Sequence, residues 1–116
     1  MMQVAVIAVG GAVGSVLRFL LQKSFQADFP YGTLTVNIIG CFLIGCLWAA
    51  SLKGMNEQLR LFLMTGFCGG FTTFSAFSLE AIQLASVGKW LIAGLYITAS
   101  LTGGLLATFL GYKILS

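Results

Sequence analysis

The stretch that decides the fold is Gly69-Gly70-Phe71-Thr72-Thr73-Phe74-Ser75-Ala76-Phe77-Ser78, which lies in the middle of a long apolar segment. Adjacent glycines disfavour a continuing helix, and threonine hydroxyls compete for main-chain partners. The pattern therefore predicts that a membrane helix is broken between Gly69 and Thr73. In hydrocarbon, the carbonyl and amide groups released by such a break must be satisfied by protein, water or an ion. The break is a candidate functional site.

The residues that follow the break repeat at helical spacing. Phe74 and Phe77 are three positions apart, as are Ser75 and Ser78. A helix that resumes here carries two aromatic rings along one edge, with two hydroxyls beside them.

The composition on either side of this stretch is that of an integral membrane protein. Of the 116 residues, 59% are apolar and 8% are charged, too few charges for the surface of a soluble domain. Four segments are long enough to cross a bilayer, namely residues 4–21, 32–52, 59–84 and 90–115. We expect an all-α protein with one four-helix transmembrane domain that covers residues 1–116. Cys41, Cys46 and Cys68 lack metal-ligand spacing, and we interpret them as packing residues.

The net charge of +3 comes from basic residues that are isolated along the chain. They do not form a patch that could bind nucleic acid. Three lie toward each side of the predicted membrane: Lys53, Arg60 and Lys113 against Arg18, Lys23 and Lys89. Because the Lys/Arg bias of short loops sets membrane orientation, this balance permits insertion both ways round. Opposite orientations permit an antiparallel homodimer.

The first segment contains small residues at positions four apart, Gly10 with Gly14 and Gly11 with Ser15. Such pairs let membrane helices approach closely, so we expect a packing face here. Arg18 follows near the end of the segment. It extends to the interface, attracts anions from a buried position or guards an aqueous entrance, and the sequence leaves these interpretations open.

The loop that follows holds Asp28 and the single proline, Pro30, which we expect to precede the second helix. In that helix Thr33 and Asn37 share one face. An asparagine in this setting either joins helices by hydrogen bonds or lines a polar path.

The later segments carry few polar groups. Tyr96, Ser100 and Gly104 repeat every four residues, which indicates a small, weakly polar stripe on the fourth helix. The carboxylate of the third segment, Glu80, has either a solvated role or a proton-carrying one. We expect Gly103 and Gly111 to serve helix packing.

The sequence has no histidine, no paired carboxylates and no phosphate-binding loop after a strand, which argues against an enzyme. Neutral hydrogen-bond donors recur inside the predicted membrane instead, and the positive edge of a phenylalanine ring can face an anion. These features suit passage of a small anion. From composition alone, however, a stripe of Phe and Ser is more often packing than pore.

The central stretch through Glu80, together with Gly10-Gly11-Ala12-Val13-Gly14-Ser15-Val16-Leu17-Arg18 and Gly32-Thr33-Leu34-Thr35-Val36-Asn37, closely resembles the Fluc (CrcB) fluoride channels. The resemblance implies passive fluoride export through two pores of an antiparallel homodimer in the inner membrane of a bacterium. It also implies a set of pore residues: Thr33, Asn37, Phe74, Ser75, Phe77, Ser78, Tyr96 and Ser100. Arg18 would stand at the pore entrance.

A bound sodium ion is a further expectation at the break. A helix that ends near Gly69 leaves carbonyls with a partial negative charge of about one half, which favours a cation. The resemblance implies that the main-chain oxygens of Gly69 and Thr72 from both subunits hold one structural Na⁺, which is not transported. Water or threonine hydroxyls are the alternative occupants.

Two other function classes compete. A proton-coupled exporter of the small multidrug-resistance type needs a carboxylate in its first span, and this chain has none there. A structural membrane subunit leaves the break and its donors unexplained.

Overall fold

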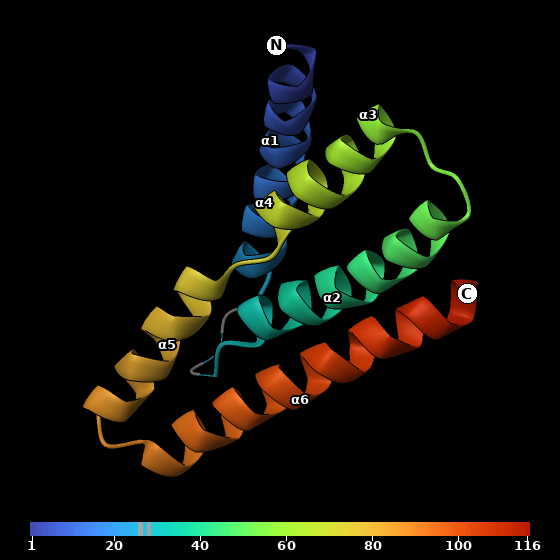
Figure 1. Cartoon of the computed structure of the whole chain (residues 1–116). Coiled ribbons are helices and arrows are strands. Elements are labelled where there is room, and N and C mark those ends of the chain that lie inside the picture. The colour runs from blue at the N-terminus through green and yellow to red at the C-terminus, as the bar shows by residue number, and fades with distance from the viewer. Residues whose placement is uncertain (26, 28) are drawn as a thin grey trace.

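The computed structural model describes every residue except Gln26 and Asp28, so the expectation for Asp28 lies outside the described residues. The described part of the chain consists of helices joined by short connections (Figure 1). Its elements are α1 (Met2–Lys23), α2 (Tyr31–Leu52), α3 (Glu57–Arg60), the π-helix η1 (Leu61–Cys68), α4 (Gly69–Phe71), α5 (Phe74–Ser86) and α6 (Trp90–Leu115).

Four helical stretches are long and apolar enough to cross a membrane: Met2–Lys23, Tyr31–Leu52, Glu57–Ser86 and Trp90–Leu115. Every boundary lies within about two residues of the expected one, which is the usual uncertainty of helix ends. The predicted four-span, all-α class is confirmed.

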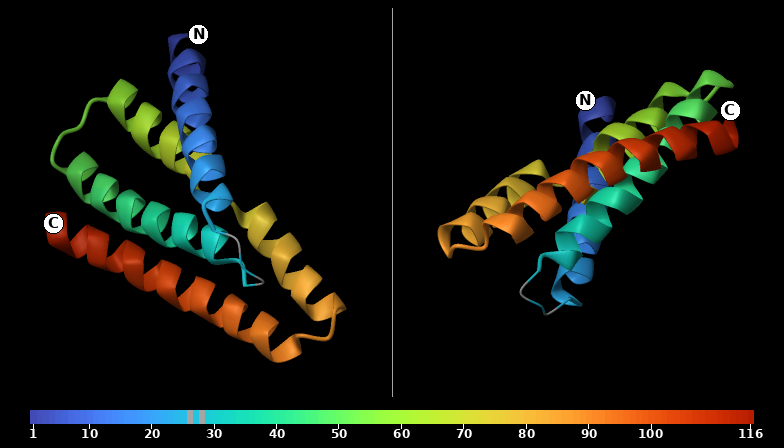
Figure 2. Two further views of the ribbon diagram at one scale, coloured as in Figure 1. Left: turned by 180° about the vertical axis from the view of Figure 1, so that it is seen from behind. Right: turned by 90° about the horizontal axis from the view of Figure 1, so that it is seen from below.

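The spans form two packed pairs (Figures 1 and 2). Helix α2 lies along α6, and α1 crosses η1 and α4, the first half of the third span. The second half, α5, leaves this crossing and packs against the first turns of α6. The break in the third span therefore lies where the two pairs meet.

The glycines of α1 explain its close contact with the third span. A Cβ atom at Gly10 would lie 2.5 Å from the carbonyl oxygen of Phe62, and one at Gly14 would overlap the carbonyl oxygen of Phe67. The two backbones touch with no side chain between them. The predicted packing role of this glycine face is confirmed.

The second pair is built in the same way. A Cβ atom at Gly111 would overlap the carbonyl oxygen of Phe42, and one at Gly103 would lie 2.8 Å from Cδ1 of Ile38. Gly45 meets the carbonyl oxygen of Thr108 in the same manner. The packing roles predicted for Gly103 and Gly111 are confirmed.

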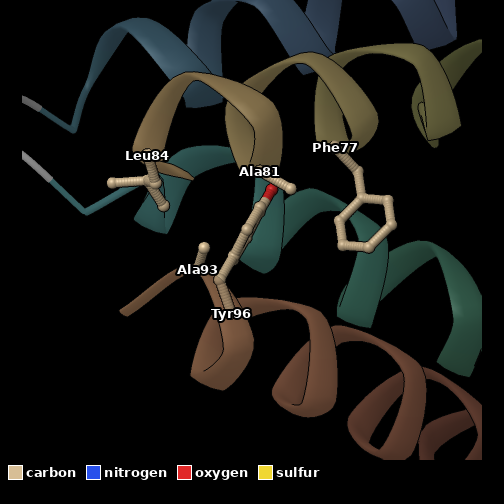
Figure 3. Close-up of a cluster of buried hydrophobic side chains, with 5 residues drawn as sticks. All are labelled: Phe77, Ala81, Leu84, Ala93 and Tyr96. Carbon is tan, nitrogen blue, oxygen red and sulfur yellow. The ribbon is translucent and has the colours of Figure 1, made fainter. Parts of the chain in front are cut away.

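Helix α5 is held on α6 by a small cluster of buried apolar side chains (Figure 3). Phe77, Ala81 and Leu84 share one face of α5 and meet Ala93 and Tyr96 of α6. Their spacing of four and three residues is that of one helical stripe. This cluster fixes the orientation of the helix that follows the break.

The third span departs from the sequence expectation in two ways. Its first half contains the π-helical η1, which the sequence did not suggest. The break itself falls within the predicted stretch Gly69–Thr73, but at its far end, because the helix continues through Gly69 and Gly70 and stops after Phe71. Thr72 (φ −86°, ψ 155°) and Thr73 (φ −148°, ψ 114°) are the extended residues.

Gly70 serves packing instead of helix termination. A Cβ atom on it would lie 2.5 Å from the carbonyl oxygen of Gly11 on α1. The pair of glycines therefore allows α1 and α4 to touch, while the two threonines carry the break.

Candidate functional site

Asn37 on α2 holds the break. Its Nδ2 atom donates to the carbonyl oxygen of Thr73 at 3.1 Å, and its Oδ1 atom accepts from the Thr73 amide at 2.8 Å. One side-chain amide thus satisfies both main-chain groups of an extended residue at membrane depth, where each would otherwise be costly. The interpretation of Asn37 as a residue that joins helices is confirmed, and its place on a polar path stays a prediction.

The two threonines satisfy the helix ends on either side of the break. The hydroxyl of Thr72 donates to the carbonyl oxygen of Cys68 at 2.9 Å. The hydroxyl of Thr73 accepts from the Ala76 amide at 3.1 Å, which caps α5, and lies 3.2 Å from the Ser75 hydroxyl.

Arg18 on α1 also reaches the break. Its Nε atom donates to the carbonyl oxygen of Gly70 at 3.0 Å, and the side chain is half-buried. The sequence suggests an interfacial, anion-attracting or entrance role, and does not suggest a contact with the break. A periodic signal for this contact was present, because Arg18 follows Gly14 by four residues and so shares the glycine face that packs on the third span.

A cavity of about 410 Å³ opens beside the break. The predicted site residues that line it are Asn37, Gly69, Thr72, Phe74, Phe77 and Ser100. Ser100 contributes a buried Oγ atom that has no hydrogen-bond partner in the described part of the chain. A buried hydroxyl without a partner can donate to a ligand in this cavity.

The two phenylalanines differ in their surroundings. Phe77 is 8% exposed, whereas Phe74 is 76% exposed. Their ring centroids lie 5.6 Å apart, and the Phe77 ring lies 5.3 Å from that of Tyr96. The structure therefore places three predicted site residues in one row of rings.

Four predicted pore residues do not line this cavity, namely Thr33, Ser75, Ser78 and Tyr96. Ser75 and Ser78 are exposed on α5 and do not line it. Thr33 is buried and accepts a hydrogen bond from Nε2 of Gln22 at 3.0 Å. Within one chain these hydroxyls do not form a track with Asn37 and Ser100.

Tyr96 is fully buried, and its hydroxyl donates to Oε1 of Glu80 at 3.1 Å. Glu80 lines a second cavity of about 310 Å³, together with Gln83 and Lys89. Phe29, whose ring lies 5.5 Å from Tyr96 in an edge-to-face arrangement, was not anticipated because nothing in its spacing relates it to the fourth span. The ring row therefore extends from the first cavity toward the second.

The break leaves the main-chain oxygen of Gly69 without its intrahelical donor. In a continuous helix the Thr73 amide would bond to the carbonyl of Gly69, but here it bonds to Asn37. The Gly69 carbonyl thus lacks its intrahelical donor, and both Gly69 and Thr72 line the first cavity. Among the described residues no cluster of His, Cys, Asp or Glu could hold a metal ion, so any cation here relies on neutral oxygens.

Comparison with known proteins assigns this architecture to a family. Residues 5–112 match the family model described as CrcB-like protein, Camphor Resistance (CrcB). The chain belongs to the CrcB-like family. Three relatives of this CrcB-like chain carry the name "Fluoride-specific ion channel FluC". The Rhizobium etli protein is 46% identical over 99% of the chain and 97% of the relative. The Flavobacterium psychrophilum protein is 49% identical over 93% and 92%, and the Agrobacterium fabrum protein is 45% identical over 98% and 96%.

Proposed function

We propose that this CrcB-like protein is a fluoride-selective channel that lets fluoride leave the cell passively through the inner membrane. The observation that carries the proposal is 46% identity, over nearly the full length of both chains, to a relative named as a fluoride-specific channel. The four spans and the site at the break supply a physical basis for it.

The first cavity offers fluoride neutral donors and no basic group of its own. Ser100 presents an unpaired hydroxyl, and Phe77 presents its ring beside Tyr96. Ring edges and hydroxyls attract an anion weakly, which allows it to move on, whereas a full positive charge would retain it. Asn37 has a second role as the residue that keeps the cavity wall in shape.

The experiment is fluoride and chloride efflux from liposomes that contain the purified protein. We expect fluoride efflux and little chloride efflux. Equal rates for the two ions would contradict the proposed selectivity, and export that requires a proton gradient would indicate an exporter instead.

The proposed assembly is an antiparallel homodimer with two pores. The first cavity is open in a single chain and has the exposed ring of Phe74 on its wall, and the hydroxyls of Ser75 and Ser78 are exposed on the same helix. A second copy packed on this side would cover those groups and bring them to the pathway. The balance of basic residues between the two sides permits the opposite orientation.

Added charge tests this assembly. Two extra lysines in one loop should bias insertion, so that each biased variant is inactive alone and active when expressed with the oppositely biased one. Full activity from one fixed orientation would exclude the antiparallel dimer.

One structural sodium ion is proposed at the centre of the dimer, held by the carbonyl oxygens of Gly69 and Thr72 from each subunit. The support is the Gly69 carbonyl that lacks an intrahelical donor and the position of both residues on the open cavity. The ion would join the subunits and would not be transported. Exhaustive removal of sodium should abolish fluoride efflux, and sodium-independent efflux would refute the ion.

A further inference from the structure

We propose that Arg18 is a positioning residue that fixes the break from the side of α1 through its hydrogen bond to the Gly70 carbonyl. In this assignment Arg18 acts by stabilising the main chain at the break, and not by attracting anions with its charge. Its consequence for flux rests on the proposed fluoride conduction, whereas its consequence for the break does not.

The contact is prepared by the glycine face of α1. Gly11 and Gly14 bring the α1 backbone against the third span, where a Cβ atom on Gly70 would lie 2.5 Å from the Gly11 carbonyl oxygen. Arg18 lies one turn beyond Gly14 on the same face. At this short separation the donor is Nε, the guanidinium nitrogen nearest the backbone, at 3.0 Å from the Gly70 oxygen.

The Gly70 carbonyl requires such a donor. In a continuous helix it would accept from the amide four residues later, that of Phe74, but the extended residues Thr72 and Thr73 intervene. The carbonyl thus lies at the last turn of a helix, where the dipole is negative and a cation is favourable. Arg18 supplies both the hydrogen bond and the charge.

Side chains from two helices therefore hydrogen-bond to the break. Asn37 of α2 holds both main-chain groups of Thr73, and Arg18 of α1 holds the carbonyl of Gly70. Between these two points lie Phe71 and Thr72, the latter with its carbonyl proposed for sodium. Loss of the Arg18 bond frees one end of this short segment while Asn37 still holds the other.

Three substitutions of Arg18 distinguish a positioning role from attraction of anions by its charge. In Arg18→Gln the amide nitrogen occupies the place of Nε along the side chain, so a donor is kept and the charge is lost. Arg18→Lys keeps the charge but puts a methylene where Nε was, with the ammonium one bond farther on. Arg18→Met has similar length and neither donor nor charge.

The first measurement is amide hydrogen exchange of peptides that cover residues 70–76 in the purified full-length protein. Because exchange follows local opening, loss of a charged hydrogen bond should speed it about ten- to hundredfold in Arg18→Met and Arg18→Lys. Arg18→Gln should stay within about tenfold of the parent. Peptides from the middle of α6 report that each variant is folded, and Lys23→Gln, a neutralised exposed residue of the same helix, is the matched control.

The second measurement is fluoride efflux, for which we expect the same order: parent and Lys23→Gln, then Arg18→Gln, then Arg18→Lys and Arg18→Met. Activity retained in Arg18→Lys and lost in Arg18→Gln would overturn the proposal and establish a role for charge at the entrance. Unchanged exchange in all three variants would overturn it as well, as would equal acceleration in all three. The Gln and Lys variants decide the question even when the Met variant is not recovered. If the parent itself conducts no fluoride, the proposed function fails while the exchange order still tests Arg18.

Discussion

Replacing Asn37 by leucine removes both hydrogen bonds that α2 makes to the break while keeping a side chain of similar size. The Thr73 carbonyl loses its donor at 3.1 Å and the Thr73 amide loses its acceptor at 2.8 Å. Each main-chain group left without a partner in a buried setting costs about 1–3 kcal/mol, so the variant should lose about 2–6 kcal/mol of folding free energy. Fluoride efflux should fall with it, because the same residues line the cavity.

Asn56→Leu is the matched control. The Asn56 side chain accepts one hydrogen bond, from the Leu59 amide at 2.8 Å, at the exposed start of α3. Loss of a helix N-cap typically costs about 1 kcal/mol. Denaturant titration in detergent, followed by circular dichroism, measures both variants under identical conditions. Equal destabilisation by Asn37→Leu and Asn56→Leu would refute the idea that Asn37 holds the break.

Phe77→Ile should lower stability by about 1–3 kcal/mol because the ring is buried, whereas Phe74→Ile, at a position 76% exposed in one chain, should leave the stability of a monomer unchanged. Both substitutions should reduce fluoride efflux. Efflux equal to that of the parent in both variants would make the rings packing residues only. Gly14→Ala should cost about 1–3 kcal/mol through overlap with the facing backbone, and Gly94→Ala, with nothing within 4 Å, should be neutral or slightly stabilising, as thermal unfolding can show. Thr73→Val should cost about 0.5–2 kcal/mol by removing the cap of α5, detectable as faster hydrogen exchange in its first turn; protection equal to the parent would exclude that role.

The four spans were predictable because hydrophobic length and glycine spacing are local properties of the sequence. The break was also predictable, since adjacent glycines and threonines both disfavour a regular helix. The exact residues of the break were harder to predict. Gly70 looks like a helix breaker, but its contact with Gly11 on another helix keeps it helical.

The hydrogen-bond partners of the break were not predictable, because they lie on other helices. Asn37 and Thr73 are separated by 36 positions, and Arg18 and Gly70 by 52, so no local pattern relates them. The sequence identified Asn37 and Arg18 as unusual polar residues in an apolar chain. Only the crossing of the spans shows that both act on one short segment.

The two glycine-lined helix contacts have a consequence for biosynthesis. Gly14 of the first span meets the third span, and Gly45 of the second span meets the fourth, so neither contact joins consecutive spans. A ribosome delivers the first two spans to the membrane before Gly14 or Gly45 has its partner helix. The first contact forms only after residue 71 has emerged, and the second only when Gly111 is available. Until then these two glycine surfaces have no packing partner within the nascent chain, so the first two spans lie in the membrane without the contacts that later fix their positions.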